Sequence, residues 1–535
     1  MPRRLPDHHR PRSSCSFLLV LLVACWLAGC AALPPAGDRE RSTAWGRPEA
    51  TALGRAVAAS AAQPRYSGFR LLVSGEDAFL TMRTLIVSAE RTLDLQYYLI
   101  HDDDSTRALL REVERAADRG VRVRFLLDDI HTAGMDQELL QLSSHPRIDV
   151  RLFNPFAGGR FSMVTRVFAS LTDIARINQR MHNKMLVADN AVAVTGGRNL
   201  GDPYFLRSPQ SNFLDLDVLA AGPVVQQLSA AFDTYWNHDL AYPVEALVRR
   251  QTRVASLDPD RLESQEPGDR PRSSLLTAPK QDLPDPPSAL AEELAQGHLQ
   301  LVWAPATLLV DEPSKIATEG DPSATETIAD DIAALLRTAQ REAIIVSPYL
   351  VPGVRGMALT EELRARGVRV RILTNSLAAT DAPVVHIGYA RYRPGLLRLG
   401  VELHELEPKI TAPRGRSLSA FGSSRASLHV KAIVIDRRTV LVGSMNMDPR
   451  SERLNTEMGL VVRSPALAHD LVRLYEAVAR RHSYRVEQGE EGGLRWVKDL
   501  GGGEAARIYH REPEATAWLR LLLWALTPFA PEEML

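Results

Sequence analysis

The spacing of apolar residues predicts alternating helices and strands in the first part of the chain. Glu76–Ala89 and Thr106–Arg119 have the apolar pattern of helices, whereas Leu93–Ile100 and Val121–Leu127 are short runs rich in β-forming residues. Such alternation is typical of an α/β fold. Further on, two short β runs bracket a turn at Asp189-Asn190.

The pattern is repeated later in the chain. RGVRVR occurs at residues 119–124 and again at 366–371, an offset of 247 residues, and LDLQYYL at 93–99 has a counterpart in IIVSPYL at 344–350. This offset far exceeds the 20–50 residues of a solenoid repeat. The sequence therefore predicts two homologous α/β halves.

Composition sets the expected boundaries between these halves and the other segments. Residues rich in Pro, Asp, Ser and Arg follow Arg250, and residues 31–66 show little periodic apolar pattern. The expected segments are a leader (1–29), a tether (30–66), a first half (67–250), a linker (251–297), a second half (298–489) and a C-terminal tail (490–535).

The N-terminus resembles a bacterial lipoprotein signal. An arginine-rich start precedes the apolar run Phe17–Leu27, which is too short to span a bilayer and ends in the lipobox Leu27-Ala28-Gly29-Cys30. We expect Cys30 to be lipidated and to anchor the chain to a membrane on the periplasmic side of the cell envelope. Ala31, where an Asp would favour the inner membrane, favours the outer one. The alternatives are a plain secretory signal and an N-terminal membrane anchor.

The cysteine content fits a periplasmic location, and the net charge argues against nucleic-acid binding. The three cysteines are Cys15, Cys25 and Cys30, so without its leader the chain keeps one and forms no internal disulfide. The leader has a net charge of +3 and the whole chain −1, which leaves −4 for the remainder. A nearly neutral chain is not expected to bind nucleic acid.

The most informative feature is a motif that occurs twice. HNKMLVADNAVAVTGGRN (182–199) and HVKAIVIDRRTVLVGSMN (429–446) share the pattern H-x-K-x4-D-x6-G-[GS]-x-N. The members of the two copies are His182, Lys184, Asp189, Gly196 and Asn199, and His429, Lys431, Asp436, Gly443 and Asn446. Two copies with identical spacing predict one site built by both halves.

Lysine is rare in this chain, which makes the motif lysines notable. Of 64 Lys and Arg residues only six are lysines, at positions 184, 280, 315, 409, 431 and 498. Lysine is a compact point charge, whereas arginine is a planar fork. Its retention in both motifs indicates contact with a phosphate in a confined pocket.

These residues are suited to cleavage of a phosphodiester without a metal. One histidine attacks phosphorus and the other protonates the leaving alcohol, which gives a covalent phosphohistidine. Lys184 and Lys431, with Asn199 and Asn446, are expected to bind the phosphate oxygens. The candidate catalytic set is completed by Asp189 and Asp436, although their position in the turn after a strand indicates a mainly structural role.

Each histidine also needs a group that fixes its tautomer. Asp215 and Glu457 are the expected orienting carboxylates, with Asp217 as the competitor of Asp215. The motif glycines at 196, 197 and 443 are expected to let the backbone approach the phosphate closely.

The paired motifs resemble the phospholipase D superfamily, in particular its cardiolipin synthase C type. The resemblance covers about residues 67–480 and includes RMHNK (180–184), GGRNLGDPYF (196–205) and GSMNMDPRSERLNTE (443–457). It implies two α/β sandwich halves around one central active-site cleft, no cofactor, and His182 as the nucleophile. It also implies phosphatidyl transfer between phospholipids that yields cardiolipin, with phosphatidylglycerol as acceptor and phosphatidylethanolamine as a further candidate substrate.

Three functions remain open at this point. Water and an alcohol use the same phosphohistidine, so the motifs do not separate a transferase from a phospholipase or a nuclease. A non-catalytic lipid-binding lipoprotein is disfavoured because both motifs are intact. A partner protein and the oligomeric state are not indicated.

Some further positions have two interpretations each. His386 and Tyr389 fit the entrance of a lipid site or a helix surface, and Asp128 and Asp129 fit substrate binding or a helix cap. The apolar run Trp518–Leu526 fits a lipid contact or, as we favour from its shortness, a helix docked on the protein core.

Overall fold

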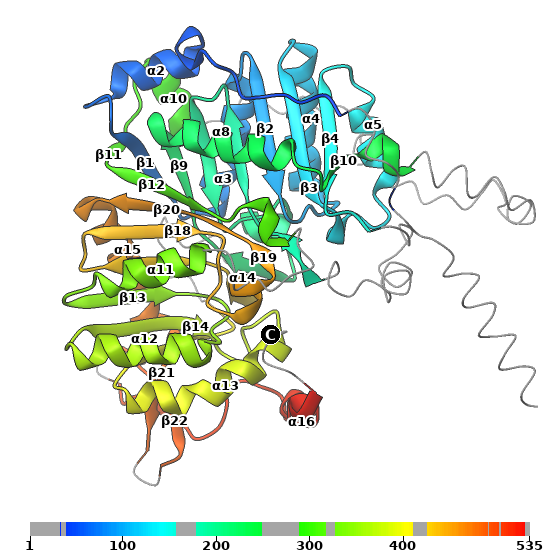
Figure 1. Cartoon of the computed structure of the whole chain (residues 1–535). Helices are drawn as coiled ribbons and strands as arrows, with labels where there is room; N and C mark the ends of the chain where they lie inside the picture. Colours follow the sequence, from blue (N-terminus) through cyan, green and yellow to red (C-terminus); the bar gives the residue numbers. More distant parts are fainter. Residues whose placement is uncertain are drawn as a thin grey trace, which may run out of the picture.

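The computed structural model describes residue 33 and residues 39–156, 178–248, 288–316, 327–409, 425–489, 492–501 and 504–529. Cys30, the leader and most of the predicted linker lie outside these residues. The described chain forms two large sheets in two halves, one above the other in Figure 1. Two short two-stranded sheets connect the halves.

The first half is built on a nine-stranded sheet with the order β10-β4-β3-β2-β6-β7-β9-β1-β11. Strands β2, β3 and β4 are parallel, and their neighbours are antiparallel. The bounds are β1 (Ser67–Leu72), β2 (Thr92–Tyr97), β3 (Arg122–Asp128), β4 (Ile148–Phe153), β6 (Met185–Ala188), β7 (Val192–Gly196), β9 (Asp217–Ala221), β10 (Ala241–Pro243) and β11 (Val302–Ala304).

The second half repeats this arrangement in a ten-stranded sheet with the order β12-β20-β18-β17-β13-β14-β15-β21-β22-β23. The run β4-β3-β2-β6-β7-β9-β1 corresponds strand for strand to β15-β14-β13-β17-β18-β20-β12, which confirms the predicted homologous halves. The bounds are β12 (Ala306–Val310), β13 (Glu342–Val346), β14 (Arg369–Asn375), β15 (Glu402–Leu406), β17 (Ala432–Ile435), β18 (Thr439–Gly443), β20 (Met458–Arg463), β21 (Ser483–Gln488), β22 (Leu494–Lys498) and β23 (Arg507–Tyr509).

Helices cover the outer faces of both sheets and also lie between them. The first half carries α2 (Ala52–Ser60), α3 (Gly75–Ser88), α4 (Asp104–Asp118), α5 (Asp136–Ser143), α8 (Pro223–Trp236) and α10 (Ala289–Ala295). The second half carries α11 (Ile328–Arg337), α12 (Gly353–Ala365), α13 (Pro383–Arg398), α14 (Pro449–Arg453), α15 (Pro465–Arg481) and α16 (Ala517–Leu526). None of the described helices is long and apolar enough to cross a bilayer.

The two halves share one apolar core. Phe232 and Trp236 of α8 and Tyr475 of α15 pack in the same cluster as residues from the inner faces of both sheets. Separate clusters lie under the outer helices of each half. Because buried apolar area is the main source of folding free energy, the shared cluster holds the halves in a fixed relation.

The expected segment boundaries differ from those of the sheets. Arg39, in the predicted tether, donates to the carbonyls of His238 and Ala241, and α2 packs on the first half. Strand β11 belongs to the first sheet although it lies beyond residue 298, and β22 and β23 extend the second sheet although they lie in the predicted tail. Composition did not reveal these additions because edge strands are short and pair with residues far away in sequence.

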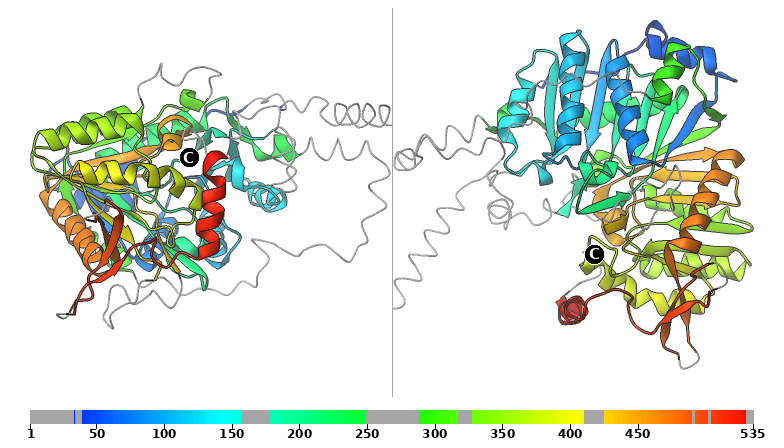
Figure 2. Two further views of the ribbon diagram at one scale, coloured as in Figure 1. Left: turned by 90° about the horizontal axis from the view of Figure 1, so that it is seen from below. Right: turned by 180° about the vertical axis from the view of Figure 1, so that it is seen from behind.

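Two parallel strand pairs join the halves at the carboxyl ends of their central strands. Strand β5 (Arg180–Met181) pairs with β19 (Asn455–Thr456), and β8 (Ser211–Leu214) pairs with β16 (Arg425–Leu428). In each pair one strand comes from the first half and the other from the second. Figure 1 shows β19 close to the boundary between the two halves, and Figure 2 shows the two halves from below and from behind.

Candidate active site

Each motif histidine lies one residue beyond a strand that pairs with the opposite half. The backbone N–H of His182, after β5, donates to the carbonyl of Thr456 at 2.9 Å, and that of His429, after β16, donates to Leu214 at 2.7 Å. The residues that follow Thr456 and Leu214 are Glu457 and Asp215. The strand pairing therefore brings each histidine beside a carboxylate of the other half.

Both histidines bind these carboxylates through Nδ1. His182 Nδ1 lies 2.9 Å from Glu457 Oε2, and His429 Nδ1 lies 2.5 Å from Asp215 Oδ2. A carboxylate accepts hydrogen bonds, so Nδ1 carries the hydrogen and Nε2 is left for chemistry. The structure thus places Asp215 and Glu457 where the sequence expected orienting groups, and it shows that each acts across the interface.

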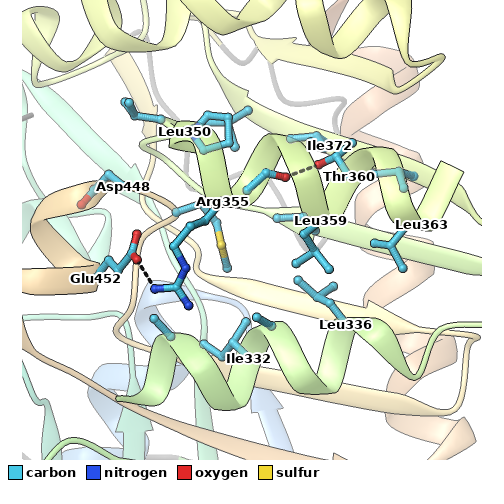
Figure 3. Close-up of a pocket in the computed structure, with 18 of the residues that line it drawn as sticks. Ile332, Leu336, Leu350, Arg355, Leu359, Thr360, Leu363, Ile372, Asp448 and Glu452 are labelled. Carbon is cyan, nitrogen blue, oxygen red and sulfur yellow. Dashed lines mark hydrogen bonds and ion pairs between the residues drawn. The ribbon is translucent and has the colours of Figure 1, made fainter. Parts of the chain in front are cut away.

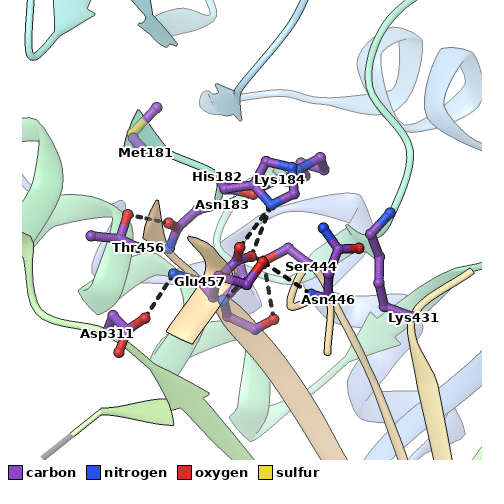
Figure 4. A network of polar contacts seen from close by, with 12 residues as sticks. Met181, His182, Asn183, Lys184, Asp311, Lys431, Ser444, Asn446, Thr456 and Glu457 are labelled. Carbon is purple, nitrogen blue, oxygen red and sulfur yellow. Dashed lines mark hydrogen bonds and ion pairs between the residues drawn. The ribbon is translucent and has the colours of Figure 1, made fainter. Parts of the chain in front are cut away.

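Glu457 is itself held by a buried network (Figure 4). Ser444 Oγ donates to Glu457 Oε2 at 2.5 Å, and the backbone N–H of Glu457 donates to Asp311 Oδ2 at 2.9 Å. Lys315 Nζ lies 2.8 Å from the same oxygen of Asp311. These contacts fix the position of the carboxylate that accepts the hydrogen bond from His182.

The motif lysines occupy equivalent places in the two halves. Lys184 Nζ donates to the carbonyl of His182 at 2.7 Å, and Lys431 Nζ donates to that of His429 at 2.6 Å. Both are fully buried, and the desolvation of the ammonium lowers the pKa of Lys184 to about 7 and that of Lys431 to about 8. Binding of an anion here would restore their charge.

The two histidines differ in their electrostatic surroundings. Desolvation, reinforced by the nearby charges of Lys184 and Lys431, lowers the pKa of His182 well below its usual value. The pKa of His429 is also lowered by desolvation, but the adjacent Asp215 counteracts this effect. Although burial opposes it, the interaction with His429 holds the pKa of Asp215 below its ordinary value, whereas desolvation raises that of Glu457 to about 7.

The motif asparagines and three aromatic rings complete the site. Asn199 Nδ2 donates to the hydroxyl of Tyr204 at 3.0 Å. The side-chain oxygens of Asn199 and Asn446 are buried and have no partner in the described part of the chain, and an amide turned by 180° would present its NH₂ there. Tyr98 packs edge-on against His182, while Tyr204 and Phe213 pack against His429.

Asp189 and Asp436, which were included in the candidate catalytic set, make structural contacts in turns. Asp189 accepts the backbone N–H groups of residues 90, 91 and 92, and Asp436 accepts those of residues 340, 341 and 342. Each lies beyond the four-residue strand that follows its motif lysine, so at about 3.3 Å per residue it is more than 10 Å along the chain from the histidine. Both carboxylates fasten a hairpin turn to the start of a central strand.

Asp217 and the motif glycines also have structural roles. Asp217 accepts from the backbone N–H and the guanidinium of Arg198, so it does not serve a histidine. A Cβ on Gly197 would lie 2.1 Å from Asp215 Oδ1, and one on Gly443 would lie 2.2 Å from the carbonyl of Met458. The glycines make room for the orienting carboxylate and the neighbouring strand, and the expectation that they border the phosphate is not supported.

The remaining candidate positions are structural too. Asp128 accepts from the backbone N–H groups of Ile130 and Met181, and Asp129 accepts from that of Phe156, so both shape the loop around β5. His386 and Tyr389 are buried, and both line a small pocket beside Tyr349 and Asn375. Tyr389 donates to Glu405, and the Nε2 of His386 lies 2.9 Å from a nitrogen of Arg393.

Several site residues were not singled out from the sequence. Ser444 occupies the position in the second motif that Gly197 occupies in the first, and this difference supplies a hydroxyl that contacts Glu457. Lys315 is one of only six lysines, which was a usable signal for a special position. Tyr98 lies in the repeated string LDLQYYL and Tyr204 in GGRNLGDPYF, but no pattern indicated that their rings would flank the histidines.

A separate apolar cavity of about 140 Å³ lies between α11 and α12 (Figure 3). Met445 and Met447 line it, whereas Asn446 between them belongs to the active site. Arg355 bridges Asp330 and Glu452 at its polar end. Neither the histidines nor the lysines of the motifs line this cavity.

The chain matches a family model and several proteins of known name. The model described as "Cardiolipin synthase, PLD-like domain" matches residues 82–236 and 332–479, one stretch in each half. "Cardiolipin synthase C" from Escherichia coli (strain K12) is 38% identical over 475 residues, which cover 88% of this chain and 97% of that protein. "Cardiolipin synthase" from Geobacillus kaustophilus (strain HTA426) is 26% identical and covers 75% of this chain and 64% of that protein.

A solved structure supports the fold independently. The crystal structure of phosphatidylserine synthase from Haemophilus influenzae Rd KW20 covers 89% of this chain and 97% of its own, with a TM-score of 0.52 and 14% identity. At that identity the likeness concerns the fold alone. Together with the duplicated motif and the matches in both halves, it shows that the chain belongs to the phospholipase D superfamily, as a phosphatidyltransferase of the cardiolipin synthase C type.

Proposed function

We propose that the chain transfers the phosphatidyl group of one phospholipid to the headgroup alcohol of phosphatidylglycerol and so makes cardiolipin, through a phosphohistidine. The observation that carries the proposal is the pair of histidines, each held by a carboxylate of the opposite half, beside two buried lysines. Two oppositely placed imidazoles match a displacement that is carried out in two steps. The similarity to a cardiolipin synthase C along nearly the whole chain supports this choice of substrate.

In the first step, Nε2 of His182 attacks the phosphorus of the donor lipid. The bond from phosphorus to the headgroup oxygen breaks, and the imidazolium of His429 gives its proton to that oxygen, so that a free alcohol leaves. The surroundings of the histidines favour these roles. The pKa of both histidines is lowered by burial, but that of His182 falls well below its usual value, whereas Asp215 opposes the fall at His429, so His429 is the more readily protonated of the two.

In the second step, His429 is neutral and takes the proton of the acceptor hydroxyl. The acceptor oxygen attacks phosphorus, the P–N bond to His182 breaks, and the enzyme returns to its starting state. Each step inverts the configuration, so two steps retain it. The same two groups exchange the roles of acid and base, as microscopic reversibility requires.

Lys184 and Lys431 stabilise the charge that develops on the non-bridging oxygens. They approach from the two halves, and their ammonium groups are buried. In such surroundings a charge interaction is stronger than in water, and it is preorganised before the reaction begins. A bound phosphodiester raises the pKa of both lysines and so secures the charge when it is needed.

Hydrolysis to phosphatidic acid is the alternative, because water can replace the acceptor alcohol. The site favours transfer since His182 and His429 expose only 7% and 6% of their surface, which restricts the access of water. The test is product analysis of purified protein in vesicles that contain phosphatidylglycerol. A four-chain diphosphatidyl product in excess over phosphatidic acid supports transfer. Phosphatidic acid alone, at every acceptor concentration, assigns the chain as a phospholipase, and activity on DNA but on no lipid would overturn both readings.

We further propose that Cys30 carries a lipid and tethers the protein to a membrane facing the periplasm, with the outer membrane favoured by Ala31. A bilayer concentrates the acceptor lipid near the tethered site. The substitution Cys30→Ser should leave the precursor unlipidated and remove it from the membrane fraction that holds the wild type. Unchanged fractionation and an unchanged mass of the mature N-terminal peptide would contradict the tether.

A further inference from the structure

Helix α16 has two apolar faces, and the described residues of the chain cover only one of them. Leu519, Leu523 and Leu526 pack on the cluster that contains Leu377 and Ile387. The opposite face presents Trp518, Leu521 and Trp524, whose exposed fractions are 70%, 53% and 75%. Residues three apart lie along one side of a helix, so these three form a continuous stripe, which we call the tryptophan stripe.

The helix is fixed to the second half by polar contacts on both sides. Before it, Glu512 binds the guanidinium of Arg393 at 2.8 Å, and Tyr484 donates to Glu514 at 2.7 Å. After it, Arg391 of α13 donates to the carbonyl of Thr527 at 3.2 Å. The tryptophan stripe is therefore held in a defined orientation on the protein surface.

The tryptophan stripe lies near the carboxyl ends of the central strands of the second sheet. The active site lies at the same end of these strands. The residues beneath α16 follow the carboxyl end of β14, in a loop and the first turns of α13. The same loop contains Asp381, which lies 3.5 Å from the hydroxyl of Ser427 and whose charge opposes the lowering of the pKa of the nearby His429. Figure 1 shows α16 beyond the end of α13, on which it packs.

The beginning of the folded chain lies at the corresponding edge of the first half. Arg39 binds the carbonyls around Ala241, which pairs with Phe153 at the carboxyl end of β4. Eight residues lie between Cys30 and Arg39, and an extended chain over these nine steps reaches at most about 30 Å. A lipid on Cys30 would therefore keep this edge of the molecule near the membrane.

We infer that the tryptophan stripe docks on the bilayer surface and holds the active-site edge against the lipid headgroups. Tryptophan prefers the boundary between headgroups and acyl chains, because its ring is apolar and its N–H is polar. Helix α16 contains no acidic residue, and Arg520 on the helix with Arg391 beside it provides positive charge for anionic headgroups. Ten residues are about 15 Å long, so the helix lies along the surface. The inference rests on the proposed function only for its choice of a lipid surface over a protein partner.

The first test measures contact with lipid directly. The full chain is reconstituted into vesicles of phosphatidylglycerol and phosphatidylcholine whose acyl chains carry bromine, which quenches tryptophan fluorescence. The variant W518F/W524F should lose most of the bromine-dependent quenching, whereas the control W45F/W303F should keep it. Equal quenching in both variants would overturn the inference.

The second test separates docking from catalysis. W518S/L521S/W524S should turn over lipid in vesicles at least about tenfold more slowly than the wild type, because three large apolar contacts with the bilayer are lost. It should act on a dispersed short-chain phospholipid within about twofold of the wild type, and the control I508S, at an exposed residue of β23, should be unaffected in both assays. A similar loss on both substrates would show that the helix supports the site itself and would overturn the inference.

The two tests also distinguish this inference from the proposed function. If no phospholipid is turned over by the wild type, the proposed function fails while the quenching experiment still decides whether the stripe meets lipid. If Trp518 and Trp524 are not quenched but are protected by a second protein that co-purifies with the chain, the stripe is a protein interface and the inference is wrong.

Discussion

Glu457 of the second half accepts the Nδ1 hydrogen of His182 of the first half at 2.9 Å. The reciprocal contact joins His429 to Asp215. Neither half contains both members of either of these two pairs, so the catalytic unit exists only when both halves are folded and joined. This dependence gives a physical reason for the shared core and for the two strand pairs that cross the interface.

Replacement of an orienting carboxylate should impair turnover without unfolding the protein. Glu457→Gln and Asp215→Asn remove the charge that fixes the tautomer of the partner histidine, and we expect kcat to fall about 10²–10⁴-fold, as for the loss of general acid–base catalysis. The measurement is steady-state turnover of phosphatidylglycerol in vesicles, with circular dichroism as the check on folding. Retention of most of the activity by either variant would mean that its histidine is oriented in another way.

Asp189→Asn should lower the stability of the protein and leave turnover nearly unchanged, the opposite of what we expect for the orienting carboxylates. Its carboxylate accepts three backbone N–H groups in a buried turn, so loss of the charge should cost about 1–3 kcal/mol of unfolding free energy. The kcat should stay within about twofold of the wild type because the residue is remote from the histidines. Thermal unfolding and turnover, measured on the same preparation, test both parts. A large fall in kcat with an unchanged Tm would restore Asp189 to the catalytic set.

We expect kcat/KM to fall on the alkaline side of its pH profile. A lysine whose pKa is lowered loses its charge as the pH rises through that pKa, which is about 7 for Lys184 and about 8 for Lys431. We therefore expect kcat/KM, which reports the free enzyme, to fall from about pH 7 upward. The fall in kcat should begin at a higher pH than the fall in kcat/KM, because bound phosphate stabilises the charged lysines. In Lys184→Arg the charge at that position persists, so the rate should be lower, but kcat/KM should begin to fall only at about pH 8, where Lys431 loses its charge. A wild-type kcat/KM that is constant up to pH 10 would contradict this role of the lysines.

Activity should survive removal of divalent metal ions. In the described residues no three side chains among His, Cys, Asp and Glu converge as a metal-binding group, and two lysines supply positive charge at the phosphate. Turnover in vesicles is measured with and without EDTA, with lipid packing held constant by monovalent salt. A large loss that one divalent ion restores would show that a metal takes part.

The halves and the motif members could be predicted from the sequence because they depend on local patterns. The repeat at an offset of 247 residues, the periodicity of helices such as α4, and the spacing of the histidine motif are all visible in one dimension. The pairing of His182 with Glu457 could not be predicted from the sequence, because strands β5 and β19 create it. These strands are two residues long and lie 275 positions apart. The edge strands β11, β22 and β23 were missed for the same reason. Asp189 illustrates a further limit of prediction from the sequence. An acidic residue that recurs in a motif can stabilise a turn rather than take part in the reaction.

The central claim is a covalent phosphatidyl intermediate on His182, and mapping of the adduct by mass spectrometry tests it most directly. The wild type and His429→Ala are mixed with phosphatidylglycerol, quenched within milliseconds to seconds at alkaline pH, where phosphohistidine is stable, and digested. The peptide that contains His182 should carry the added phosphatidyl mass, and it should accumulate if the slow step of the variant is the one that needs His429 as base. His182→Ala should show no adduct. An adduct on His429 would reverse the roles of the two histidines, and the absence of a histidine adduct under every condition, in a preparation that makes product, would contradict the covalent mechanism.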